Sequence, residues 1–226
     1  MTMLRTMNYK LRTKHGLTLT EMTVVVASIV LLAAIGVPAV RVFIHSFESE
    51  SGTKSMISAA LASARAMSAQ KQRYVGIRFQ KAYCPEGPLK ADQYMIFIIH
   101  DAQIRANGFR AVEGLKPIKL PDSIGIREVA GGPDDTTLSI VFSTSGKLVI
   151  HEVRAMNKDG RLDDSSEDDI FNTLAKITHP TNPRGMFVQD GGDRPSQNSF
   201  VIYNKTQSEQ VQTIYINPYT GTIISE

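Results

Sequence analysis

The sequence GLTLTEMTVVVASIVLLAAIGVPAV, at residues 16–40, decides how the rest of this chain is interpreted. From Met22 to Val40 it is a run of nineteen residues without a charge. A helix rises about 1.5 Å per residue, so a run of this length spans the ~30 Å hydrocarbon core of a bilayer. The run predicts a membrane segment at about 22–43. The alternative is a buried helix in a soluble protein.

Charge is distributed unevenly around this run. Residues 1–16 contain four of the chain's 25 Lys and Arg residues and no acid, which gives +4. The other 21 basic and 22 acidic residues give −1. Basic residues concentrate on the cytoplasmic side of a membrane segment. We therefore expect a single-pass protein of the cytoplasmic (inner) membrane, with a cytoplasmic N-terminus and a periplasmic, extracytoplasmic C-terminal domain.

Glu21 is the only charged residue between Lys14 and Arg41. A carboxylate at the edge of a membrane helix costs free energy, and such residues tend to be functional. An ordinary secretory signal, cleaved near Val37-Pro38-Ala39, is an alternative interpretation. It leaves Glu21 without a role and discards the whole apolar run.

Gly16 to Glu21, followed at once by the apolar run, resembles the class III signal of type IV pilins and type II secretion pseudopilins. The resemblance implies that a prepilin peptidase cuts between Gly16 and Leu17 and that Leu17 is then N-methylated. It makes Glu21 the fifth mature residue, where the family keeps its glutamate, and it assigns a helix kink to Pro38. Leu17 departs from the family, which more commonly has phenylalanine.

The resemblance also implies a role for Glu21 in subunit assembly. In the family's filament, this carboxylate lies near the N-terminal amine of a neighbouring subunit. Pairing the two charges lowers the cost of removing both from water and favours one axial register. The alternative is that Glu21 is an interfacial residue that snorkels to the headgroups.

Beyond Arg41 the pattern stays helical and becomes amphipathic, with apolar residues at three- and four-residue intervals from Met56 to Met67. We expect one long helix over 17–72, after a basic leader peptide at 1–16, and a β-rich globular domain at 73–226. Alternating or apolar runs predict strands at 74–79, 94–99, 137–142, 147–150, 200–203, 211–216 and 222–224. The predicted fold class is α+β and pilin-like, a long N-terminal helix packed on a mainly antiparallel β-sheet domain.

The stretch Ala62–Arg73, which leads into a strand, and Ile140–Gly146 resemble, more loosely, the H-type minor pseudopilins. Loops are expected near 80–92, 155–170 and 178–199. The second loop contains an acidic cluster at 157–169, whose spacing does not match an EF-hand, so a solvated loop is favoured over a calcium site. Cys84 is the only cysteine, which excludes an internal disulfide and a Cys-rich metal site.

These observations predict a pseudopilin or minor pilin that joins a type II secretion pseudopilus or a type IV pilus-like filament for protein secretion. The resemblance implies other pilin or pseudopilin subunits, a prepilin peptidase and an inner-membrane assembly platform as partners. No enzyme motif or His pair at metal spacing stands in the sequence, so no catalytic residue, metal, cofactor or small-molecule substrate is expected. The alternatives are a minor pilin that binds DNA for uptake and an unprocessed membrane-tethered binding domain. The near-neutral mature charge gives nucleic acid little support as a partner.

Overall fold

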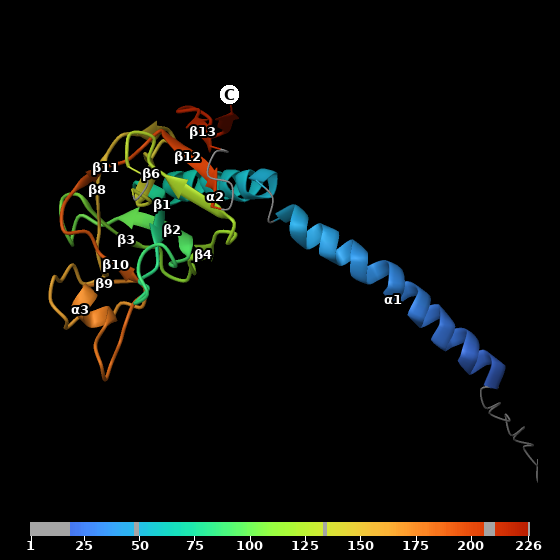
Figure 1. Ribbon diagram of the computed structural model, residues 1–226. Helices are drawn as coiled ribbons and strands as arrows, with labels where there is room; N and C mark the ends of the chain where they lie inside the picture. Colours follow the sequence, from blue (N-terminus) through green and yellow to red (C-terminus); the bar gives the residue numbers. More distant parts are fainter. Residues whose placement is uncertain (1–18, 48–49, 133–134, 206–210, 226) are drawn as a thin grey trace, which may run out of the picture. The chain divides into compact units, whose positions relative to one another are not determined.

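The computed structural model describes residues 19–47, 50–132, 135–205 and 211–225 (Figure 1). The chain forms two units, Met1–His45 and Ser46–Glu226. Most of helix α1, Leu19–Phe47, belongs to the first unit. The second unit contains helix α2, Glu50–Lys71, the short helix α3, Leu174–Ile177, and all the strands that the described residues form.

Helix α2 forms because its sequence is rich in alanine, the best helix former, and carries an apolar stripe. The residue after it, Gln72, has φ of 50°, the left-handed conformation that commonly ends a helix. Ile57, Leu61 and Ala64 on the stripe are fully buried. The helix therefore supplies one wall of the core of unit 2.

The largest sheet of unit 2 has eight strands in the order β11-β8-β3-β2-β1-β6-β7, with β4 paired to β2. Strand β1 lies at its centre and is antiparallel to both β2 and β6, whereas β3 and β8 are parallel. The bounds of these strands are β1 Val75–Lys81, β2 Gln93–His100, β3 Gly108–Ala111, β4 Ile118–Lys119, β6 Leu138–Phe142, β7 Leu148–Val149, β8 Glu152–Ala155 and β11 Arg194–Pro195.

The large sheet is covered on both faces. Because successive strand residues point to opposite faces, Val75, Ile77 and Phe79 of β1 face one core, which contains α2. The alternate residues of the neighbouring strands face a second core, closed by Phe171 and Phe187. These two phenylalanines belong to the parallel pair β9, Phe171–Asn172, and β10, Phe187–Val188. In Figure 1, β9, β10 and α3 lie on the side of unit 2 away from α2.

A four-stranded antiparallel sheet completes the core under α2. Its order is β14-β13-β12-β5, and its inward residues, such as Phe200 and Ile214, join the first core. The side chain of Gln93 bonds both the N–H and the C=O of Ile126 on β5, at 2.8 and 2.7 Å. The buried amide thus satisfies backbone groups of β5, the strand at one end of this sheet. The bounds are β5 Ile124–Arg127, β12 Ser199–Asn204, β13 Val211–Ile216 and β14 Ile223–Ser225.

Several strands match the sequence prediction. Strands β1, β2, β6, β12, β13 and β14 lie where alternation or apolar runs predicted them. The strands predicted at 137–142 and 147–150 are β6 and β7, which pair antiparallel as a hairpin with Gly146 at φ of 74° between them. Strands β3, β4, β5 and β8 to β11 have short or mixed sequences and were not predicted.

The predicted fold class is wrong. The helical region is not one helix over 17–72, since α1 ends at Phe47 and α2 begins at Glu50. Most of α1 belongs to a different unit from the sheets, and the helix whose residues share a core with the strands is α2. Outside helices α2 and α3, the regular structure of unit 2 consists of β-strands in three sheets. The prediction followed the helical periodicity on both sides of 47–50, which does not distinguish one helix from two consecutive helices.

The predicted membrane segment at about 22–43 is also contradicted. Within the residues that the structure describes, no helix combines the length and the apolar character that crossing a membrane requires. The predicted single-pass inner-membrane topology and the transmembrane assignment depend on this segment and are therefore contradicted as well. The prediction rested on the absence of charge over 22–40, but this run includes Thr23, Ser28, Gly36 and Pro38, which are uncharged without being strongly apolar.

Candidate functional site

The residues of the predicted leader signal are only partly described. Gly16 and Leu17, the predicted cleavage and methylation positions, lie outside the described residues, as does the leader peptide at 1–16. Glu21 is exposed in the first turn of α1, where the positive end of the helix dipole favours a carboxylate. Pro38 lies inside α1, which is continuous from Leu19 to Phe47, and the kink assigned to it stays a prediction.

The surface of α1 is apolar and uncovered in its described part. Leu32 is 68% exposed and Ile29 60%, values typical of polar surface residues. A shallow apolar hollow of about 820 Å³ follows one face of the helix. It is lined by Leu19, Met22, Thr23, Val26 and Ala27, which are three or four residues apart and therefore share that face.

The two hydroxyl groups of this apolar stretch are satisfied within α1. Thr23 donates a hydrogen bond to the carbonyl oxygen of Leu19 at 2.9 Å, and Ser28 donates to that of Val24 at 2.8 Å. Burying a hydroxyl without a hydrogen-bond partner costs roughly 1–3 kcal/mol in proteins. Because both hydroxyls are already bonded, α1 from Met22 to Leu32 can be covered by apolar groups without that cost.

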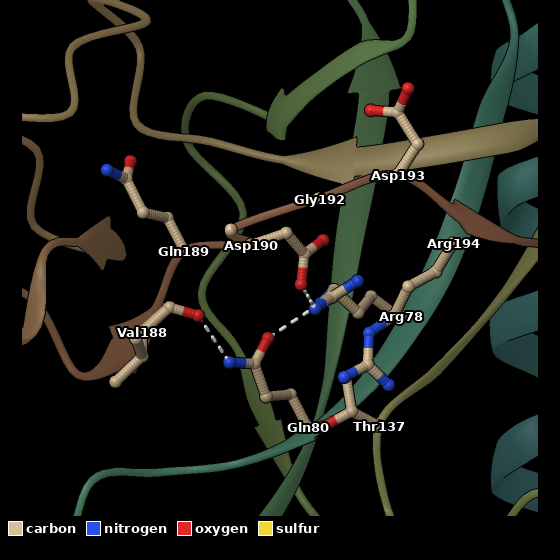
Figure 2. A pocket seen from close by; sticks show the side chains of 10 residues that line it. Arg78, Gln80, Thr137, Val188, Gln189, Asp190, Gly192, Asp193 and Arg194 are labelled. Carbon is tan, nitrogen blue, oxygen red and sulfur yellow. Dashed lines mark hydrogen bonds and ion pairs between the residues drawn. The ribbon is translucent and has the colours of Figure 1, made fainter.

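Unit 2 contains a polar pocket of about 480 Å³ beside β1 (Figure 2). Arg78, at the centre of β1, is only 1% exposed, and its Nη2 lies 2.5 Å from Oδ1 of Asp190. Its Nε donates to Oε1 of Gln80 at 2.6 Å, and Gln80 in turn donates to the carbonyl oxygen of Val188 at 2.7 Å. The other carboxylate oxygen of Asp190 accepts the N–H of Ala155 at 2.7 Å. The network ties β1, β8 and the segment after β10 together.

Opposing electrostatic effects act on the Arg78 side chain in this pocket. Burial lowers the pKa of Arg78, the adjacent Asp190 opposes that shift, and Arg194 nearby lowers the pKa further. Figure 2 shows the Arg194 side chain beside Arg78, whereas the Asp193 carboxylate points away from it. The two guanidinium groups supply hydrogen-bond donors, and the carboxylate of Asp190 is already bonded to Arg78 and to the N–H of Ala155. The pocket therefore holds the segment after β10 on the sheet.

The acidic cluster at 157–169 is built into turns. Asp168 accepts backbone N–H groups from Lys158 and Ile170, at 2.7 and 2.8 Å. Asp163 accepts the N–H of Ser165 at 2.9 Å. Across the described residues, no group of three or more His, Cys, Asp or Glu side chains is placed to hold a metal ion.

Sequence reasoning missed the buried ion pair. Arg78 alternates with Val75, Ile77 and Phe79, so the pattern assigns it to a solvent-facing side of the strand. No local signal in the sequence identifies Asp190 as its partner, because the two residues are 112 positions apart.

Comparison with protein-family models, with curated proteins and with solved structures finds no match to this chain.

Proposed function

We propose that this chain is a filament subunit processed like a prepilin. A prepilin peptidase cuts between Gly16 and Leu17, the new N-terminus at Leu17 is methylated, and the mature chain assembles with other pilin-like subunits for protein secretion. The observation that carries the proposal is the order of Gly16, Glu21 and the apolar run in one short stretch.

The surface of α1 supports assembly through this helix. Apolar side chains of this size exposed together mark an interaction surface, and those of α1 extend from Leu19 to Leu32. Burying one Val, Leu or Ile side chain contributes about 1.5–3 kcal/mol. Packing α1 against the same helix of another subunit removes this surface from water. The bonded hydroxyls of Thr23 and Ser28 allow it at no polar cost.

Glu21 sets the register in this proposal. It is the only carboxylate in α1, and a neighbour's N-terminal amine is the cation that the cleavage would create. An ion pair removed from water stabilises only when its geometry is good, so a one-turn slip between subunits would break this pair. The pair therefore favours one axial offset between neighbouring subunits.

The test is mass spectrometry of the N-terminus of the protein purified from its native source. We expect a mature chain that begins at Leu17 and carries one additional methyl group. A chain that begins near Val40 or an intact Met1 would contradict the proposal. A second measurement counts subunits in isolated filaments, where Glu21→Ala is expected to lower incorporation at least tenfold. Ser28→Ala, on the same helix, is the matched control and is expected to assemble normally.

A further inference from the structure

Two histidines that are 51 positions apart in the sequence meet beside the ends of two strands of the large sheet, β2 and β8. His100 ends β2 and His151 precedes β8, and their ring centroids are 5.7 Å apart with an interplanar angle of 59°. Both residues are half-buried, so their rings are reachable from solvent. The pair lies wholly within unit 2 and is independent of the processing proposed for the N-terminus.

Each ring has one nitrogen fixed as a donor. Nε2 of His100 lies 2.8 Å from the carbonyl oxygen of Ala106, and Nδ1 of His151 lies 2.5 Å from that of Glu152. A carbonyl oxygen only accepts, so these nitrogens carry the protons. In the neutral rings, Nδ1 of His100 and Nε2 of His151 are then left as acceptors with a lone pair. A ring N–H donated to a backbone carbonyl is the usual support of a metal-binding histidine.

The spacing of the two rings also suits a shared ion. A metal held about 2.0–2.1 Å from an imidazole nitrogen lies about 3.2 Å from the centroid of that ring. Two rings that share one ion at a tetrahedral angle then have centroids about 5.2 Å apart. The observed 5.7 Å is about half an ångström longer, so the two rings lie near the separation that one shared ion requires.

The surroundings hold the rings in place. Tyr74 packs on both, with centroids 5.8 Å from His100 and 4.7 Å from His151, and Phe109 lies against both at 5.3 and 5.6 Å. The backbone N–H of His100 donates to the carbonyl oxygen of Tyr74 at 2.9 Å, and that of His151 donates to Oγ of Ser196 at 2.9 Å. Ligands whose rotamers are fixed by packing lose less entropy when an ion binds.

We propose that His100 and His151 form a binding site for a divalent transition-metal ion of the class that imidazole prefers, such as Zn²⁺, Cu²⁺ or Ni²⁺. The ligands are Nδ1 of His100 and Nε2 of His151. Two protein nitrogens leave the other positions of the ion to water or to a group from a bound partner. Binding is therefore open and reversible, and the fold does not depend on it.

The first experiment titrates the full chain, free of any histidine tag, with Zn²⁺ alone by isothermal calorimetry. We expect one ion per chain. The variants His100→Gln and His151→Asn place a side-chain N–H near the original donor position and remove the ring acceptor. Each is expected to weaken Zn²⁺ binding at least tenfold. His179→Asn replaces a half-buried histidine whose Nδ1 accepts the N–H of Asn182 in a local turn; it is the matched control and is expected to bind as the wild type does.

The second experiment needs no substitution, so it decides the matter even where a variant does not fold. Ring nitrogens of ¹⁵N-histidine-labelled wild-type chain are followed by NMR during the Zn²⁺ titration. We expect the resonances of Nδ1 of His100 and Nε2 of His151 to shift together at one equivalent. No saturable binding, shifts confined to the other three histidines, or binding unchanged in both variants would each overturn the proposal.

Discussion

The two faces of the large sheet are both buried, but by different means. On the face toward α2, Val75, Ile77 and Phe79 pack against Ile57 and Leu61, and burial of apolar area is the dominant stabilising contribution. On the other face, Arg78 is buried at the same level and requires named partners, above all Asp190. Apolar packing tolerates adjustment, whereas a buried charge depends on one counter-ion. The two faces should therefore respond differently to the loss of one side chain.

The largest effect is expected from Asp190→Ala, on the polar face. It leaves the Arg78 guanidinium buried without a counter-ion and the N–H of Ala155 without its acceptor. We expect a loss of about 3–5 kcal/mol in the free energy of unfolding, measured by urea denaturation. The double variant Arg78→Met with Asp190→Asn removes the charge and keeps an acceptor for Ala155. It should be more stable than Asp190→Ala, and equal or lower stability would show that the charge is not the cause.

The next effect belongs to the α2 face. Leu61→Ala removes a fully buried side chain and leaves a cavity between α2 and β1, so we expect a loss of about 2–4 kcal/mol. Leu61→Met nearly conserves volume and is the matched control, with an expected loss below about 1.5 kcal/mol. If Leu61→Met lowered the stability as much as Leu61→Ala does, apolar packing on this face would tolerate substitution no better than the ion pair on the other face.

This difference explains what the sequence could predict. On the α2 face, apolar residues recur about every 3.6 residues along the helix and every second residue along the strands. The stripe from Met56 to Met67 and strands β1, β2 and β6 were therefore recognisable in the sequence. The second face was not, because its covering strands β9 and β10 have two residues each and no period. The counter-ion of Arg78, Asp190, comes from a distant loop that no local pattern identifies.

The same limit applies to the sites. The N-terminal signal is a local motif, so Gly16, Leu17 and Glu21 could be named from spacing alone. His100 and His151 appeared scattered in the sequence, and only the pairing of β2 with β3 and of β3 with β8 brings them together. The single long helix was predicted wrongly because helical periodicity continues on both sides of the boundary between the two units, at His45 and Ser46, and hides that boundary.

A third prediction tests how closely the strands approach at β1. A Cβ atom added to Gly76 would lie 2.3 Å from the carbonyl oxygen of Ile140 on β6. Gly76→Ala must therefore push β1 and β6 apart, and we expect a loss of about 1–3 kcal/mol by urea denaturation. Gly192→Ala meets open space beside the pocket and should change the stability by less than about 0.5 kcal/mol. Equal losses of stability in the two variants would contradict the close approach of β1 and β6 at Gly76.

The smallest effect is expected for a half-exposed pair at the rim of the same sheet, Asp101 and Arg110, whose Oδ2 and Nε are 2.9 Å apart. Burial alone raises the pKa of Asp101, but hydrogen bonds from Arg110 and from the N–H of Gln103 outweigh it and leave the pKa below its ordinary 3.8. A carboxylate whose pKa is lowered by folding stabilises the protein above the unfolded pKa and loses that contribution as the pH falls through the folded value. Asp101→Asn should therefore cost about 1 kcal/mol or less at pH 7, and the difference from wild type should shrink below pH 3.8. A difference that stays constant down to pH 2 would show that hydrogen bonding, rather than the charge of Asp101, carries the contribution.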